Sequence, residues 1–293
     1  MYGQHPSLQE LKMKGLIAAL AIAVSSMAFA QSMLVLNTGK VLTINDQGML
    51  FDLGNFLLPY EIKEMGGRYI IDKDRKLRTV DQNGVLYSKE REDKVPNNVE
   101  FFGDNYFISK KGLLYTIDEN GFLYEVEKEK AYKDIKHKGG NFFISEKKVE
   151  KKKTLALFVV NNSGQVAEMN VPGLNLEKVN YVGGRYFTTT AAELFTVSHD
   201  GFVYSKKSVG AFRGSDMKKG GNYFILRGNV HTVSDSGIVT NYGSVQSYGY
   251  AKHYGTNFFI SPDGKLYTIS SSGVIKNVNF GYKPSDISHF SHL

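Results

Sequence analysis

The chain has 293 residues, with 36 Lys and Arg against 29 Asp and Glu, which gives a formal net charge of +7. It contains no cysteine, so disulfides, a lipid-attachment cysteine and a cysteine nucleophile are all excluded. The excess of positive charge is modest. In a chain that is predicted below to be exported, it argues against nucleic acid as a partner.

The first thirty residues have the pattern of a cleavable signal peptide. Lys12 and Lys14 precede an apolar run over residues 15–24, and Ala28-Phe29-Ala30 supplies the small-x-small pattern that signal peptidase cleaves after. The apolar run is shorter than the roughly 20 residues that a permanent membrane helix needs. The sequence therefore predicts that residues 1–30 are removed.

The predicted mature chain, residues 31–293, shows no linker or low-complexity segment that would divide it. We expect it to fold as a single domain and to be soluble in a bacterial periplasm or secreted beyond it. Translation could start at Met1 or at Met13.

A unit of about 37 residues recurs seven times from Met33 onward. Its clearest copy is LYTIDENGFLY, from Leu114 to Tyr124, in which Thr and Ile precede a short polar residue, two variable positions and a Gly. A polar side chain that bonds back to the turn, followed by a Gly that can adopt positive φ, predicts a tight β-hairpin. The turn glycines are Gly48, Gly84, Gly121, Gly164, Gly201, Gly237 and Gly273.

Each unit has two further turns. One is marked by a Gly, usually paired, then Asn or Arg and two apolar residues, as in GGNFFIS at Gly139 and GTNFFIS at Gly255. The other lies between the two markers, as in SKKG at Ser109 and SPDG at Ser261. Three turns join four strands, and a longer link such as residues 125–133 leads into the next unit.

Seven copies of four antiparallel strands resemble the seven-bladed β-propeller repeat proteins over the whole predicted mature chain. The resemblance is to the class, because WD-repeat, quinoprotein-type and Kelch propellers need tryptophans that this chain lacks. A stacked solenoid is the alternative, but it requires polar capping units at its ends. In this chain, residues 286–292 match residues 134–140, which begin a unit. The next strand of that last unit exists only at residues 33–37, so the two ends of the chain complete one unit.

The resemblance implies an all-β propeller that is closed by its own termini. One strand from the C-terminus and three from the N-terminus would share a blade, which removes the exposed sheet edges that promote aggregation.

The fourth copy contains the first candidate binding site. Val159 lies 43 residues after Thr116, and the extra residues, EKKVEKKKT over 146–154, lengthen the turn between the second and third strands. With the same turns of adjacent copies, this forms a basic arc beside the crossover links that would bind an anionic polymer such as lipopolysaccharide or a cell-wall polymer. The alternative is that these lysines are mixed with glutamates on a solvated surface, where they aid solubility and bind no ligand. The arc consists of Lys73, Arg75, Lys76, Lys110, Lys111, Lys147, Lys148, Lys151, Lys152 and Lys153.

The second candidate site lies on the first strand of each unit. Ring closure would place His253, His289 and Glu64 on neighbouring blades around a central channel. Two imidazoles and a carboxylate suit a metal ion or a hydrolytic site. Alternatively, strand alternation points these side chains between the sheets, and the sequence assigns no metal and no cofactor.

Catalytic signatures are absent from the sequence, which has no G-x-S-x-G elbow, H-E-x-x-H helix or phosphate-binding Gly loop. The recurring Thr and the aromatic pairs are interpreted as packing between blades. The sequence therefore predicts a non-enzymatic binding or scaffolding propeller of the cell envelope, monomeric by default, that recognises a protein or an anionic glycan on its loop face. The alternative is a propeller hydrolase or lyase that acts on glycan or peptide in the channel, and a third option is assembly with other copies of itself.

Overall fold

The computed structural model describes residues 32–291, with gaps at 56–58, 82–84, 89–94, 97, 127–131, 150–151, 207–211, 213–216, 245–252 and 262. The predicted signal peptide and Lys151 lie outside the described residues. In the part of the chain that is described, no helix has the length and apolar character needed to cross a membrane.

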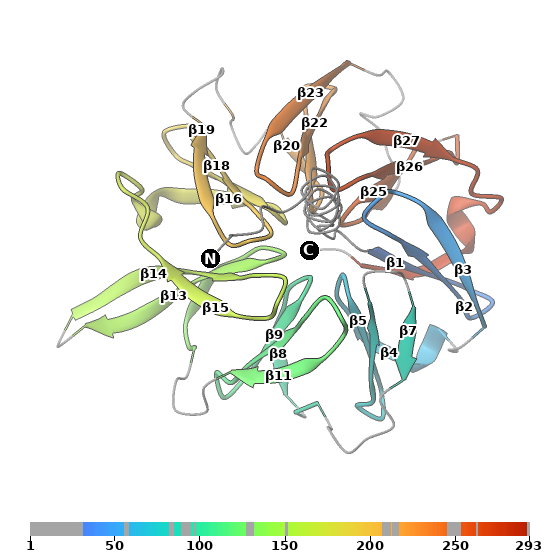
Figure 1. The fold of residues 1–293 in the computed structure, drawn as a ribbon, viewed down its shortest axis with the longest axis horizontal. Coiled ribbons are helices and arrows are strands. Elements are labelled where there is room, and N and C mark those ends of the chain that lie inside the picture. Colours follow the sequence, from blue (N-terminus) through green and yellow to red (C-terminus); the bar gives the residue numbers. More distant parts are fainter. Residues whose placement is uncertain are drawn as a thin grey trace, which may run out of the picture.

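The strands form seven four-stranded antiparallel sheets arranged in a ring (Figure 1). In six of the sheets the strands pair in chain order, and in the seventh the last strand of the chain pairs with the first of three N-terminal strands. The first and fourth strands of each unit are the edges of its sheet. The chain is therefore an all-β, seven-bladed propeller, and the predicted fold is confirmed.

The bounds of the elements follow the repeat. Blade 1 consists of β28 (Ile287–Phe290), β1 (Ser32–Leu36), β2 (Lys40–Ile44) and β3 (Leu50–Asn55). Blade 2 consists of β4 (Ile62–Met65), β5 (Tyr69–Asp72), β6 (Leu77–Val80) and β7 (Leu86–Ser88). Blade 3 consists of β8 (Val99–Phe102), β9 (Tyr106–Ser109), β10 (Leu114–Ile117) and β11 (Leu123–Val126). Blade 4 consists of β12 (Ile135–Lys138), β13 (Phe142–Val149), β14 (Lys152–Val160) and β15 (Val166–Met169).

The remaining blades have the same plan. Blade 5 consists of β16 (Val179–Val182), β17 (Tyr186–Thr189), β18 (Leu194–Val197) and β19 (Val203–Lys206). Blade 6 consists of β20 (Met217–Lys219), β21 (Tyr223–Leu226), β22 (Asn229–Val233) and β23 (Val239–Ser244). Blade 7 consists of β24 (His253–Tyr254), β25 (Phe258–Ile260), β26 (Leu266–Ile269) and β27 (Ile275–Val278). Short 3-10 helices are η1 (Pro59–Glu61), η2 (Leu176–Lys178) and η5 (Pro284–Asp286).

Ring closure occurs in blade 1, as predicted. The C-terminal β28 pairs antiparallel with the N-terminal β1, with Leu34 opposite Phe290 and Val35 opposite His289. The Ser291 amide continues the ladder by donating to the Met33 carbonyl at 3.0 Å. The first and last strands of the ring are therefore joined by backbone hydrogen bonds.

The core lies between neighbouring blades and is built from the second and third strands. In β9, for example, all four residues are buried, because alternation sends their side chains to both faces of a sheet that is covered on both sides. Aromatic rings meet across the blade junctions, as between Tyr69 and Phe107, whose ring centroids are 5.6 Å apart. The predicted packing role of the aromatic pairs is confirmed.

The repeated turn bonds four of the described blades to their neighbours. Gly121 adopts a φ of 77°, and the Asp118 carboxylate accepts a hydrogen bond from the Phe122 amide at 2.8 Å. The Thr116 hydroxyl donates to the carbonyl of Gly164, the turn glycine of the next blade, at 2.7 Å. The recurring Thr is thus structural, as predicted, and blades 2, 5 and 7 repeat the contact.

Two kinds of turn converge around the axis of the ring (Figure 1). The turns between first and second strands are linked by backbone hydrogen bonds, for example from Asp104 to the Gly140 carbonyl at 2.7 Å. The turns between third and fourth strands are linked in the same way, as from His199 to the Asp235 carbonyl at 3.1 Å. The turns between second and third strands lie at the other end of the strands, beside the crossover links, where the Lys110 amide donates to Asn98 at 2.6 Å.

Candidate binding site at the blade 4 arm

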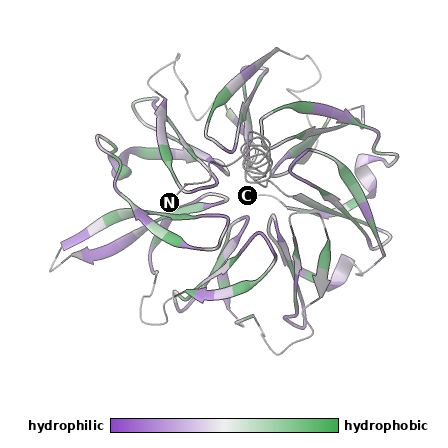
Figure 2. Ribbon diagram, in the orientation of Figure 1, coloured by the Kyte–Doolittle hydropathy of each residue, from purple (hydrophilic) through white to green (hydrophobic). Residues whose placement is uncertain are grey.

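Blade 4 has a hairpin that is longer than its counterparts. β12 pairs with β13 only as far as Ser145, and β15 pairs with β14 only from Leu157 onward. Beyond these positions, residues 146–149 of β13 lie opposite residues 152–155 of β14. We call this two-stranded extension the blade 4 arm. It projects outward from the ring (Figure 1), and its outer part is hydrophilic (Figure 2).

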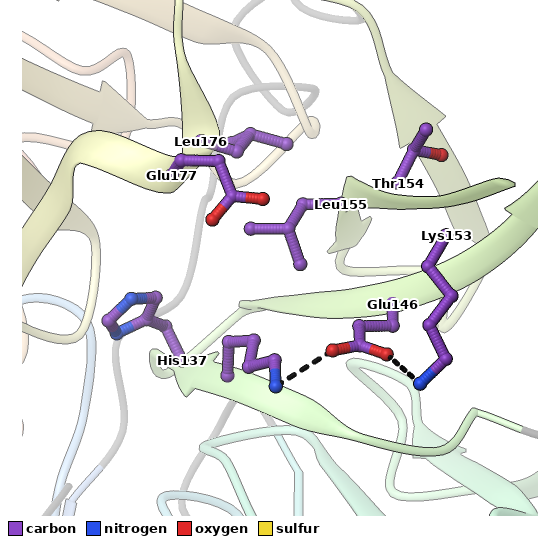
Figure 3. A pocket seen from close by; sticks show the side chains of 8 residues that line it. His137, Glu146, Lys153, Thr154, Leu155, Leu176 and Glu177 are labelled. Carbon is purple, nitrogen blue, oxygen red and sulfur yellow. Dashed lines mark hydrogen bonds and ion pairs between the residues drawn. The ribbon is translucent and has the colours of Figure 1, made fainter.

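A cavity of about 310 Å³ lies at the base of the arm (Figure 3). Three strands of blade 4 and the 3-10 helix η2, which leads into blade 5, contribute to it. The lining residues are Lys136, His137, Glu146, Lys153, Thr154, Leu155, Leu176 and Glu177.

One carboxylate joins the two lysines of this cavity. Glu146 makes ion pairs with Lys136 at 2.8 Å and with Lys153 at 2.7 Å, which are drawn as dashed lines in Figure 3. Hydrogen bonds from Lys136 and then from Lys153 lower the pKa of Glu146 to about 2. The same contacts raise the pKa of both lysines. Glu146 is therefore an internal anion between two cations at an open site.

The apolar side of the cavity is fixed by the core. Leu155 and Leu176 pack against the hydrophobic cluster between blades 4 and 5 that includes Phe142 and Phe187. η2 begins at Asn175, whose side chain accepts a hydrogen bond from the Glu177 amide at 3.0 Å. This cap satisfies the first turn of η2, and the packing of Leu176 and Leu155 on one cluster holds η2 beside β14. The cavity therefore combines an apolar wall with charged side chains.

The outer lysines of the arm differ in their partners. Lys147 forms an ion pair with Glu168 on β15. Lys148 and Lys152 are exposed, and neither makes an ion pair with another described residue. These two lysines are therefore available to an external anion.

The other predicted members of the basic arc occupy the matching turns of blades 2 and 3. Lys73 lies 3.9 Å from the Glu61 carboxylate, with its Nζ 5.1 Å from the centre of the Tyr60 ring. Arg75 has a φ of 67° in a turn that also contains the exposed Lys76. Lys110 and Lys111 of blade 3 are exposed as well. The arc thus consists of separate positions on three neighbouring blades.

The predicted channel residues occupy equivalent positions on first strands. Glu64 is opposite Ile71 in blade 2, His253 is opposite Ile260 in blade 7, and His289 is opposite Val35 in blade 1. His289 Nδ1 lies 2.8 Å from the Ser288 hydroxyl, and partial burial lowers the pKa of His289. Among the residues that the structure describes, no three His, Cys, Asp or Glu side chains are grouped so that they could hold a metal ion. A joint role for these three residues stays a prediction.

The sequence reasoning missed a set of polar side chains at the axis, which we call the axial cluster. Thr256 of blade 7 donates to the Asp104 carboxylate of blade 3 at 3.1 Å, and Arg68 of blade 2 donates to Asn162 of blade 4 at 3.1 Å. Blades that are not neighbours are thus bonded directly across the axis. The cluster consists of Arg68, Asp104, Asn162, Arg185, His199, Asp235 and Thr256.

Burial dominates the electrostatics of the axial cluster. It raises the pKa of Asp104 to about 6 and, together with repulsion from Arg185, lowers the pKa of Arg68 to about 10. Burial and the two nearby guanidinium groups also lower the pKa of His199, so its imidazole is neutral. The sequence signal for this cluster is the Arg in both GGR turns, Arg68 and Arg185, where four other copies have Asn.

The fold and the arm together define the class of protein: a seven-bladed β-propeller with one extended blade and an axis bridged by polar side chains. No family model matches the chain, and no curated protein matches it.

Among solved structures, the chain is similar to TolB from Acinetobacter baumannii, with a TM-score of 0.28 and 12% identity, over 92% of this chain and 69% of that one. It is also similar to the tricorn protease, with a TM-score of 0.20 and 13% identity, over 82% of this chain and 29% of that one. Likenesses this distant transfer no residue and no activity.

Proposed function

We propose that the protein is an exported, non-enzymatic binding propeller of the bacterial cell envelope that holds an anionic glycan at the blade 4 arm. The observation that carries this proposal is the pairing of Glu146 with Lys136 and Lys153 at an open cavity. An internal carboxylate already occupies the position that a carboxylate or phosphate group of a ligand would take between the two lysines.

The size of the cavity supports a single ionised unit of a polymer as the group that enters it. Its volume of about 310 Å³ is at the small end of the range for ligand pockets, which run from roughly 300 to 1,000 Å³. Leu155 and Leu176 would contact the apolar face of a sugar ring, while the charged side chains contact its acidic group.

The outer arm would hold the next units of the same polymer. The exposed Lys148 is opposite Lys153 and therefore lies on the face of the arm that carries Glu146. The exposed Lys152 is opposite Val149 and lies on the other face, so a polymer that contacts both lysines would cross the edge of the arm. Exposed charges interact over about 10 Å at 0.1 M salt, so binding should weaken as the ionic strength rises. An acidic surface of a partner protein is the alternative ligand.

The test measures binding of the predicted mature chain, residues 31–293, to polygalacturonate, lipopolysaccharide and uncharged dextran at two salt concentrations. One variant changes Lys147, Lys148, Lys151, Lys152 and Lys153 to Ser. The matched control removes the same charge elsewhere by changing Lys63, Lys206, Lys265, Lys276 and Lys283 to Ser.

We expect the parent and the control variant to bind one of the charged polymers and not dextran, and the arm variant to lose about ten-fold or more in affinity. Equal loss in both variants would mean that net charge alone is responsible and would refute the arm as the site. If neither charged polymer binds, but the parent captures an acidic protein from envelope extract and the arm variant does not, the ligand is a protein and not a glycan.

A third variant, with Glu64, His253 and His289 changed to Ala, addresses the predicted channel site. We expect it to fold and to bind the polymer like the parent. If the parent cleaves a glycan or peptide and this variant does not, the alternative function as a hydrolase or lyase is favoured instead.

A further inference from the structure

A ring of exposed apolar side chains surrounds the axis at the turns between third and fourth strands. In six of the seven blades, the residue directly after the turn glycine is large, apolar and between 42% and 57% exposed. In blade 4 the same position holds an exposed glutamine, Gln165. We call these six residues the apolar annulus: Met49, Val85, Phe122, Phe202, Ile238 and Val274.

The fold itself does not require these side chains. Gln165 shows that a polar residue is accepted at this position, because the side chain points to solvent and the turn is held by the glycine and the short polar residue before it. Single exposed apolar residues are ordinary on protein surfaces, but a contiguous patch marks an interaction site. Six exposed apolar residues at one repeated position around the axis go beyond single scattered residues.

Tyrosines on the fourth strands of blades 3 and 5 extend the annulus toward the next blade. Tyr124 and Tyr204 are 46% and 40% exposed and lie two residues beyond Phe122 and Phe202, on the same face of their strands. Each also reaches the turn glycine of the next blade. A Cβ added to Gly164 would lie 3.3 Å from the Tyr124 ring, and one added to Gly237 would lie 2.7 Å from the Tyr204 ring.

The charge of the same turns is negative. The seven four-residue turns contain no Lys or Arg, and their acidic residues are Asp46, Asp81, Asp118, Glu119, Asp200 and Asp235. Asp200 is exposed and Glu119 is half-buried, whereas Asp46, Asp81 and Asp118 are buried and Asp235 is paired with Arg185. Two lysines on fourth strands lie near the annulus. Lys276 donates to the Gln47 carbonyl at 3.0 Å, and Lys206 Nζ lies 5.9 Å from the centre of the Tyr204 ring. The acidic residues of the turns outnumber these two lysines.

We propose that the apolar annulus is the docking surface for an amphipathic segment of a partner protein that carries Lys or Arg beside large apolar side chains. The apolar residues of the segment would cover the annulus, and its cations would face the acidic turns. Charge complementarity decides between occupants: a second copy stacked annulus to annulus would oppose the same acidic turns, and an anionic lipid surface would be repelled.

This surface is separate from the blade 4 arm, because it lies at the opposite ends of the strands. The two sites can therefore be tested independently. One variant changes Phe122, Phe202 and Ile238 to Gln, the residue that blade 4 already has at this position. Its control changes Tyr60 to Gln, since Tyr60 is 71% exposed and precedes β4, away from the annulus.

The probes are two synthetic peptides of the same length and apolar content, one of Leu and Lys and one of Leu and Glu, measured by fluorescence anisotropy. We expect the Lys peptide to bind the parent and the Tyr60→Gln control, and to bind the triple Gln variant about ten-fold or more weakly. A second variant, with Glu119→Gln and Asp200→Asn, should weaken binding and reduce its dependence on salt. Thermal unfolding followed by circular dichroism checks that each variant is folded.

Equal binding of the Lys and Glu peptides to the parent, or undiminished binding to the folded triple variant, would overturn the proposal. Sedimentation of the parent at increasing concentration provides a further check. Self-association that the triple variant abolishes would identify a second copy as the occupant and would refute a cationic partner.

Discussion

Glu146 on the blade 4 arm and Asp104 at the axis are both carboxylates in cationic surroundings, yet their acidities shift in opposite directions. Hydrogen bonds from two lysines lower the pKa of the half-buried Glu146 to about 2. Burial raises the pKa of Asp104 to about 6, although Arg185 and Arg68 both oppose this shift. The comparison shows that desolvation outweighs nearby opposite charge once a carboxylate leaves water.

The difference also separates two structural roles. Charged groups on the arm remain solvated, so they can exchange one partner for another at little cost. Those at the axis are held between blades, where exchange would leave a buried charge unpaired. The arm is therefore suited to binding, and the axial cluster to holding the ring together.

The largest expected effect comes from crowding the axis. In Gly103→Ala the added Cβ would lie 2.2 Å from the Tyr106 ring and 2.6 Å from the Gly140 carbonyl, and both neighbours are fixed in the core. We expect a loss of about 3 kcal/mol or more in the free energy of unfolding, measured by denaturant titration.

Gly173→Ala is the matched control for this change. Gly173 has a φ of 80° but no atom within 4 Å of an added Cβ, so only backbone strain should act, at a cost of about 1 kcal/mol. If the two variants were equally stable, the turns at the axis would be looser than their contacts indicate.

The second prediction concerns Asp104→Asn, which keeps the side-chain oxygen that accepts from Thr256 and removes the charge. The pKa of Asp104 is raised from 3.8 to about 6 in the fold, so its protonated form stabilises the protein below about pH 4, and that contribution is lost as the pH rises through 6. The variant should gain up to about 3 kcal/mol over the parent at about pH 7 and nothing at about pH 4.

The unfolding midpoints of Asp104→Asn and of the parent, measured across this pH range, test the sign of the predicted stability difference. A variant that is less stable than the parent at neutral pH would show that the ionised Asp104 is needed as a counter-ion for Arg185 and Arg68.

The smallest effect is expected at the arm. Glu146→Gln removes the internal anion between Lys136 and Lys153, and the exposure of the two lysine side chains predicts little change in stability. Affinity for the anionic polymer should rise by about three- to ten-fold, because the ligand no longer competes with the protein's own carboxylate. Isothermal titration at low salt measures the change, and a weaker complex would mean that Glu146 positions the lysines for the ligand.

The sequence predicted the ring because its determinants are local. Asp118 and Gly121 define a turn within one short segment, and the same pattern recurs in every copy, so the number of blades follows from counting. The lengthened blade 4 hairpin was predicted for the same reason, from the 43 residues that separate Thr116 and Val159. The closing blade followed from matching the two ends of the chain.

Features that need several blades at once could not be predicted. The cavity at the arm uses Leu176 and Glu177 from the link into blade 5, whose position depends on how η2 packs against β14. Asp104 and Thr256 meet across the axis although 152 residues separate them in the chain. The apolar annulus was visible as a recurring Phe, Ile, Val or Met after the turn glycine, but the repeat alone gives no measure of exposure.

Closure through β28 and β1 sets an order of events for folding. The edge of β1 has no partner until residues 287–290 are available, so blade 1 is the last blade that can be completed during synthesis. A chain that ends before β28 would keep β1 paired with β2 but would leave its other edge without a partner. That edge would expose a strand of five apolar or small residues to pairing with another copy.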